Sequence, residues 1–248
     1  DVYKRQVSFT LTAAPGQARV DRLQARWRGG ALSGAARLGL GGVSTDFVLQ
    51  GAEIGGLGLK AGGVALAAGR LDLRASLAAI GTRPAAWATS LSGDGRIDLR
   101  DARLEGFSLG AVANRARALD SLGGLVGLVE AGLGGGATPV ASAGATVKAT
   151  QGVLTTRDLV VNADGGAVDG AGSVDLGRRA LDLRLTLRLA GGGLPPLGVG
   201  LTGGWDSPTV ALDANALQRM LADRLGVAAP PGGKPPKPAD LLRGLLRR

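Results

Sequence analysis

The chain has 248 residues, 45% of them hydrophobic, so it is long enough to bury a core as one β-rich domain or as a domain with appendages. It has no cysteine and no histidine, which excludes disulfides, thiol nucleophiles, Cys/His zinc sites and the usual histidine general base. Aromatic residues make up only 3%, and apolar content built from Leu, Val and Ala favours contact with flexible hydrocarbon over stacking on bases or sugars.

The formal net charge of +9 is compatible with an anionic membrane surface or with nucleic acid as a partner. Most arginines fall on the polar positions of expected strands, where a solvated outer face accounts for them, so no nucleic-acid partner is predicted. No apolar stretch is long enough for a membrane-spanning helix, and no signal peptide is recognisable. The sequence begins at Asp1 without an initiator methionine, so we expect it to be a piece of a longer protein.

The first 80 residues predict a series of short strands separated by glycine turns, at 7–12, 20–27, 31–40, 45–50, 54–60 and 70–77. Loops this short join antiparallel neighbours, as in a meander. A five-residue phrase recurs at 69–73, 95–99 and 172–176. It consists of a glycine, then an arginine or serine, then an aspartate with one apolar residue on each side. It predicts the starts of strands in a repetitive sheet.

The middle of the chain departs from strand alternation. Apolar residues between 109 and 132 recur at helical spacing, although Gly123, Gly124 and Gly127 weaken that helix. The glycine-rich stretch 132–144 is expected to be a flexible connection.

Strands are predicted again at 145–149, 152–156, 158–162, 167–176, 180–189, 197–202 and 209–212. The strongest alternation in the chain lies at 181–189, where every second residue is leucine and the apolar face is about 30 Å long. With the neighbouring stretch it defines the candidate residues for contact with hydrocarbon: Leu181, Leu183, Leu185, Leu187, Leu189, Leu197, Val199 and Leu201.

The end of the chain changes composition twice. Residues 217–225 have the spacing of a short amphipathic helix, and the proline-rich stretch 230–238 predicts an extended linker. Residues 239–248 form a basic amphipathic segment, which is either a membrane or partner contact or a frayed tail. Its candidate contact residues are Leu241, Leu242, Arg243, Leu245, Leu246 and Arg247.

No motif in the sequence predicts catalysis. The stretch 198–203 matches a dinucleotide-binding fingerprint in spacing, but it is itself strand-like and opens no helix. The aspartates between 158 and 182 lack the spacing of a calcium loop and belong to strand faces and turns. No Gly-x-Ser-x-Gly elbow occurs, so we predict no enzyme, no metal and no cofactor.

An ordered series of features over residues 91–226 resembles the C-terminal region of the AsmA family of bacterial envelope proteins. The series begins with Ser-Gly-Asp-Gly-Arg-Ile-Asp-Leu at 92–99 and Leu-Glu-Gly-Phe-Ser-Leu before the expected helix. It continues with Gly-Val-Leu-Thr-Thr-Arg-Asp-Leu at 152–159, Gly-Ser-Val-Asp-Leu at 172–176 and Leu-Asp-Leu at 181–183. It closes with Leu-Pro-Pro at 194–196, Gly-Gly-Trp-Asp-Ser-Pro at 203–208 and a terminal helix.

The resemblance implies a mostly β fold, a strongly curved antiparallel sheet that forms an open groove, with a helical insert and a C-terminal helix. Residues 1–91 would supply strand repeats of the groove, 92–226 the AsmA-like region, and 227–248 the linker and basic tail. The family implies a periplasmic protein, anchored in the inner membrane through an N-terminal helix, that passes phospholipids between the inner and outer membranes. Two alternatives stay open: a structural factor for outer-membrane protein assembly acting through protein contacts, and an extracellular binding module of β-sandwich type.

Overall fold

The computed structural model describes residues 7–61, 63–118, 132, 134–191, 195–213 and 215. Strands make up 69% of these residues, so the mostly β prediction is confirmed. The strands are β1 (Ser8–Ala14), β2 (Gln17–Trp27), β3 (Gly30–Gly39), β4 (Gly42–Glu53), β5 (Lys60–Ala61), β6 (Val64–Ile80), β7 (Ser92–Glu105), β8 (Ala137–Thr150), β9 (Val153–Ala163), β10 (Gly166–Asp175), β11 (Ala180–Leu189), β12 (Leu197–Gly204) and β13 (Thr209–Asp213). Two short helices, α1 (Pro84–Ser90) and α2 (Leu109–Arg117), complete the described elements.

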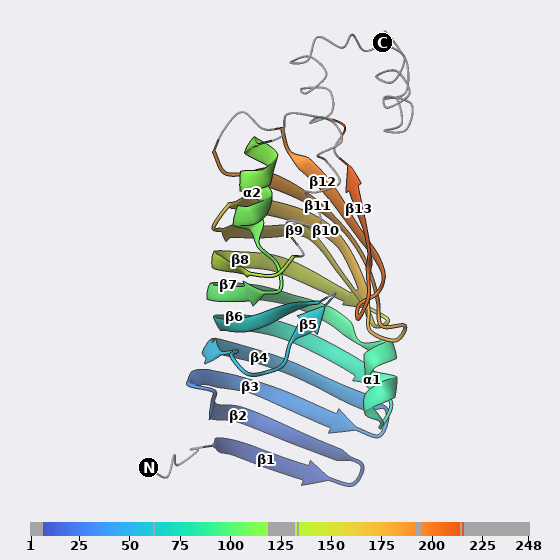
Figure 1. Cartoon of the computed structure of the whole chain (residues 1–248). Helices are drawn as coiled ribbons and strands as arrows, with labels where there is room; N and C mark the ends of the chain where they lie inside the picture. The colour runs from blue at the N-terminus through green and yellow to red at the C-terminus, as the bar shows by residue number, and fades with distance from the viewer. Residues whose placement is uncertain are drawn as a thin grey trace, which may run out of the picture.

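The strands form one antiparallel meander (Figure 1). Each strand pairs with its neighbours in the chain from β1 to β13, except that the two-residue β5 pairs only with β6 and leaves β4 beside β6. Helix α1 fills the connection from β6 to β7, and α2 the connection from β7 to β8. The sheet is not closed, so among the described strands β1 and β13 are its two edges.

The strand register places apolar residues in rows that cross the sheet, because side chains two apart on a strand share a face. One row runs through eight strands from β4 to β12 and contains no polar side chain. Its members, in order, are Ala52, Leu71, Leu99, Ala143, Val161, Val168, Leu187 and Leu197. We call the face that carries this row the apolar face.

The opposite face, here called the polar face, has a matching polar row. That row runs from β4 to β13 through Asp46, Ser76, Asp94, Lys148, Thr155, Ser173, Asp182, Thr202 and Thr209. Strict alternation on successive strands, kept in register by short turns, therefore gives the sheet two chemically distinct sides.

Helix α2 packs on the apolar face at one end of the strands. Its buried residues Leu109, Val112 and Ala116 form a core cluster with Leu187 and Leu197 of the sheet. Ser108 caps the helix by accepting a hydrogen bond from the Ala111 N–H, 3.1 Å away, at the end where helical N–H groups lack partners. In Figure 1, α2 and the segment that carries β5 lie in front of the sheet.

Glycines allow irregularities inside the long strands. Gly172 lies where the β9–β10 register shifts, and its φ of +150° is one that residues with a side chain rarely adopt. A Cβ there would lie 2.1 Å from the carbonyl oxygen of Asp182, which no real contact permits. The glycines of the recurring phrase, Gly69, Gly95 and Gly172, lie within strands, so the prediction that they mark strand starts is wrong.

Three further predictions about elements are wrong. Residues 54–59 are not a strand, because glycines with positive φ at 51, 56 and 58 turn the chain, and only Lys60–Ala61 pairs as β5. Residues 137–144 are not a flexible connection, because they pair with β7 as the first half of β8. The strands predicted at 152–156 and 158–162 are one strand, β9.

The helix predicted from 109 ends at Arg117 within the described part of the chain, and α1 was not predicted. The remainder of that helix, the helix at 217–225, the linker and the basic tail lie outside the described residues. Neither α1 nor α2 has the length and apolar character that crossing a membrane requires.

Candidate functional site

The eight predicted lipid-contacting residues all lie on the apolar face. Leu181, Leu183 and Leu185 alternate with exposed Asp182, Arg184 and Thr186 along β11. The β11–β12 register sets Leu183 beside Leu201, Leu185 beside Val199 and Leu187 beside Leu197. The residues predicted from the sequence pattern therefore lie on two strands, β11 and β12, that pair directly in the sheet.

The eight residues differ in accessibility because α2 covers part of the face. Leu187, Leu189 and Leu197 are buried in the core cluster under the helix, with Leu197 only 1% exposed. Leu181, Leu183 and Leu201 are half-buried outside that cluster. One end of β11 thus belongs to a dry core, and only the other end contributes to an accessible surface.

A further accessible part of the apolar face lies over strands other than β11 and β12. A second row crosses β3 to β8 through Leu32, Leu49, Leu73, Ile97 and Ala145. Ile97 lies in a central strand of the sheet and is still 39% exposed. The signal for these residues was the recurring phrase itself, because it places Leu71, Leu73, Ile97 and Leu99 on one face.

The apolar face stays accessible at both edges of the sheet. Phe9 and Leu11 of β1 are more than half exposed, and Val210 of β13 is 39% exposed. Leu11 continues the face through Val20 of β2, and Val210 continues it through Leu201 of β12. Exposed apolar surface of this extent is uncommon unless something covers it.

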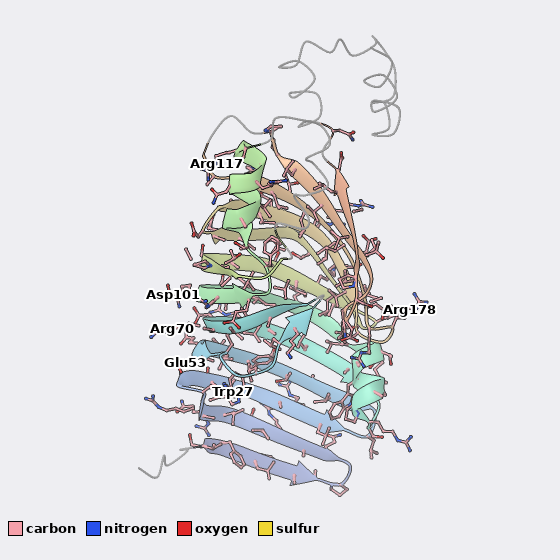
Figure 2. All side chains as sticks on the ribbon, viewed as in Figure 1. Trp27, Glu53, Arg70, Asp101, Arg117 and Arg178 are labelled. Atoms are coloured by element: carbon pink, nitrogen blue, oxygen red, sulfur yellow. The ribbon has the colours of Figure 1, made fainter. Side chains whose placement is uncertain are left out.

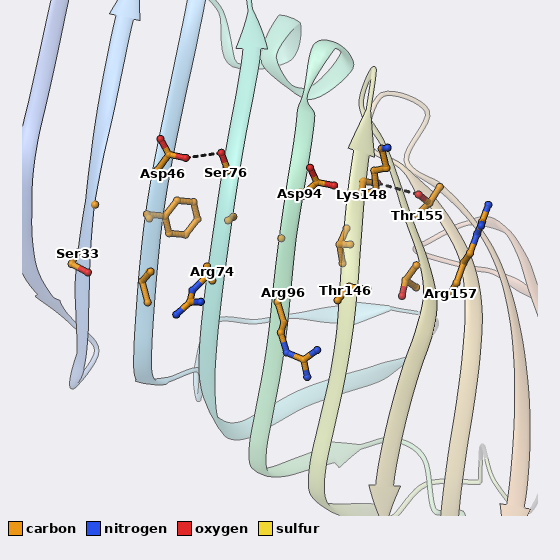
Figure 3. Close-up of a pocket in the computed structure, with 17 residues that line it drawn as sticks. Ser33, Asp46, Arg74, Ser76, Asp94, Arg96, Thr146, Lys148, Thr155 and Arg157 are labelled. Carbon is orange, nitrogen blue, oxygen red and sulfur yellow. Dashed lines mark hydrogen bonds between the residues drawn. The ribbon is translucent and has the colours of Figure 1, made fainter.

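The polar face carries a hollow with a volume of about 970 Å³ (Figure 3). Its polar lining comes from β3 to β9 and includes Ser33, Asp46, Arg74, Ser76, Asp94, Arg96, Thr146, Lys148, Thr155 and Arg157. The Ser76 hydroxyl donates to Asp46 across the β4–β6 pair at 2.5 Å. The lining of the hollow is mixed in charge, with Asp46 and Asp94 beside Arg74, Arg96, Lys148 and Arg157.

Charged side chains of the polar face pair with charges of the neighbouring row, either along one strand or across to the next strand. On β6 and β7 the register sets Arg70 opposite Arg100 and Asp72 opposite Asp98. Arg100 forms an ion pair with Asp72, and Arg96 binds both oxygens of Asp98 at 2.8 Å. Alternating rows of arginine and aspartate therefore neutralise one another, as expected for a solvated sheet surface.

One carboxylate of this face has an altered pKa. The Thr146 hydroxyl donates to Asp158 at 2.7 Å and the Thr146 N–H at 2.8 Å, and the Thr156 hydroxyl adds a third bond. These bonds stabilise the charged form and hold the pKa of Asp158 below its ordinary value of 3.8. A depressed pKa at a fully hydrated position favours a structural role over proton transfer.

The rims of the sheet are also charged. Figure 2 shows Glu53, Arg70 and Asp101 along one side of the sheet, and Arg178 at the opposite side. No group of three acidic side chains among the described residues is arranged to hold a metal ion.

Comparisons of this chain with protein-family models, curated proteins and solved structures give no match. The described fold defines a class, an open antiparallel meander with one apolar and one polar face. Any assignment of function rests on those two faces.

Proposed function

We propose that this chain binds the acyl chains of phospholipids along its apolar face and helps carry them between two membranes. In this proposal the sheet curves into an open groove, and the protein works in the periplasm, held to the inner membrane by a segment outside this sequence. The resemblance to the AsmA family suggests this role, and the chemistry of the apolar face supports it.

The observation that carries the proposal is the unbroken apolar row from Ala52 to Leu197. Ala52, Leu187 and Leu197 are buried, so the accessible part of the row runs over five strands from Leu71 to Val168, a path about 19 Å long at about 4.8 Å between strands. The hydrocarbon core of a bilayer is about 30 Å thick, so one acyl chain spans about half of that. The row is therefore long enough for an extended acyl chain to lie across the strands.

The side chains of the apolar row suit a phospholipid that moves along the sheet. Leucine, valine and alanine offer a smooth surface without polar anchors, and burial of each methylene contributes about 0.8 kcal/mol wherever it lies along the row. A headgroup stays in water above the open face, while the polar face keeps the other side of the sheet solvated. Binding then depends on chain length more than on headgroup identity.

The first experiment is native mass spectrometry of the chain after periplasm-directed expression and gentle purification. We expect phospholipid to co-purify with the folded protein. A folded, lipid-free protein that also fails to take up phospholipid from vesicles would contradict the proposal and favour the assembly-factor alternative.

A matched pair of variants separates surface contact from general damage. Ile97 on the apolar face and Val160 on the polar face lie within strands and are 39% and 41% exposed. We expect Ile97→Glu to reduce bound phospholipid by about tenfold or more, because a carboxylate against hydrocarbon is strongly disfavoured. Val160→Glu should leave lipid binding unchanged, and circular dichroism should show both variants folded. Equal loss in both variants would refute a role for the apolar face.

A further inference from the structure

The accessible part of the apolar row begins at a covered end. Where β4 passes into the segment that carries β5, Ala52 and Ile54 are 0% and 1% exposed. The Ile54 N–H donates to the Gly69 carbonyl of β6 at 3.0 Å, which holds the start of this segment against the sheet. In Figure 1 the segment lies in front of the strands. The first accessible member of the row is therefore Leu71, on the next strand of the sheet.

Helix α2 covers the other end of the row. Leu187 and Leu197 are buried in the cluster beneath the helix, and Val168 is half-buried at the border of that cluster. The helix packs closely: a Cβ at Gly165, in the turn between β9 and β10, would lie 2.6 Å from the backbone nitrogen of Gly110 in α2. Backbone packed against backbone leaves no room for hydrocarbon between them, so the row ends at α2.

The length between these two ends matches one acyl chain. The half-buried members of the row are Leu71, Leu99, Ala143, Val161 and Val168, on five adjacent strands. Five strands at about 4.8 Å give a length of about 19 Å. The hydrocarbon of one bilayer leaflet is about 15 Å thick, and an extended palmitoyl chain is about as long as the row. One chain of ordinary membrane length fits between the covered ends, whereas two chains placed end to end do not.

We propose that the two covered ends make this row a site for a single acyl chain and determine the chain length that it binds best. The inference rests on the proposed function, because it concerns the same hydrocarbon ligand. Within the row, each added methylene contacts aliphatic side chains and tightens binding about two- to fourfold, depending on how fully it is buried. Beyond the row, added methylenes meet the β5 segment or α2 and turn away from the face into water. The affinity therefore stops rising once the chain fills the row.

Lysophosphatidylcholines that differ only in their acyl chain test this limit. The probes carry octanoyl, lauroyl, palmitoyl, arachidoyl and lignoceroyl chains, and each is delivered from a cyclodextrin complex so that no micelles form. Calorimetric titration gives the affinities after correction for the carrier. We expect a steep rise from octanoyl to palmitoyl and less than about a twofold further gain up to lignoceroyl.

The same titrations separate this inference from the proposed function. An affinity that rises as steeply beyond palmitoyl as before it would overturn the inference and leave the proposed function standing. A folded protein that binds none of the five probes would contradict the proposed function, and this inference with it.

A matched pair of variants tests whether the row sets the limit. Leu71 and Leu77 are both half-buried on the apolar face of β6, but Leu77 lies six residues along the strand from the row, about 20 Å away. Leu71→Glu places a carboxylate at the first accessible strand, where it excludes hydrocarbon. We expect it to shorten the best-bound chain by one strand spacing, roughly four methylenes, from palmitoyl to lauroyl.

Leu77→Glu should leave the best-bound chain length unchanged, and circular dichroism should show both variants folded. An equal shift in both variants, or a shift in neither, would overturn the inference. The chain-length series of the unmodified protein tests the inference independently of how either variant folds.

Discussion

Thr138 connects α2 to the sheet through two hydrogen bonds made by one buried hydroxyl. Its side chain is 2% exposed, accepts from the Leu109 N–H at 2.9 Å and donates to the Phe107 carbonyl at 2.8 Å. The Leu109 N–H belongs to the first turn of α2, where N–H groups have no helical partner. The sequence did not predict this contact, because it joins residues about thirty positions apart.

We expect Thr138→Val to lower the free energy of unfolding by about 1–3 kcal/mol, because a buried N–H and a buried carbonyl lose their partner while the shape is kept. Urea denaturation measures the change. The control is Thr155→Val on the polar face, which should stay within about 0.5 kcal/mol of the parent. Equal stability of both variants would show that water replaces the Thr138 hydroxyl.

The hydrogen bonds on Asp158 make a pH-dependent contribution. Because its pKa is lowered in the folded protein, the bonds stabilise the fold above pH 3.8, and that contribution is lost as the pH falls through the lowered pKa. We expect Thr146→Val to raise the pKa of Asp158 toward its ordinary value, since the hydroxyl is the largest cause of the shift. Carboxyl chemical shifts followed by NMR titration measure it. An unchanged pKa would contradict the assignment.

At the scale of the elements, long alternating segments were predictable and short or small-residue segments were not. β11 was found because five leucines alternate with polar residues. The first half of β8, residues 137–144, consists of small residues apart from Pro139 and Val140, and it is a strand because it pairs with β7 and not because of its own pattern. In residues 54–59, Ile and Leu are interspersed with glycine, a pattern that resembles the alternation of a strand. Helix α1 has only seven residues, too few to show helical periodicity.

The candidate site was predictable only in part for a similar reason. Alternation shows which residues share a face, but it does not show what else packs on that face. The cover of α2 over Leu187 and Leu197 comes from tertiary packing, as does the open position of Ile97. The five leucines of β11 were therefore all predicted as lipid contacts, although α2 buries Leu187 and Leu189 and leaves Leu181 and Leu183 partly accessible.

This division predicts different effects for different residues of the apolar face. We expect Leu197→Ala to lower the free energy of unfolding by about 2–5 kcal/mol, the range for large-to-small changes in a core, because Leu197 is 1% exposed. Leu38→Ala on β3 removes a side chain that is 50% exposed and should cost less than about 1 kcal/mol. Chemical denaturation of both compares them. A small loss in Leu197→Ala would show that α2 packs loosely on the sheet.

At the scale of the whole molecule, the two faces account for much of the composition. The charge of +9 comes mainly from arginines, and Arg19, Arg96, Arg100 and Arg188 pair with aspartates. The hydrophobic residues of the chain are mostly aliphatic, and they form the rows of the opposite face. A composition rich in aliphatic residues and in arginine thus fits a molecule with one apolar and one polar surface.

The meander topology also determines which insertions could lengthen the sheet during evolution. Because nearly every strand pairs only with the strands before and after it, inserting one hairpin between two strands would leave all other pairings and both faces unchanged. A single inserted strand would instead reverse the direction of all that follow. Gene duplication of hairpin-sized units is therefore an accessible route to longer or shorter sheets of this design, in the manner of repeat proteins whose units contact only their neighbours.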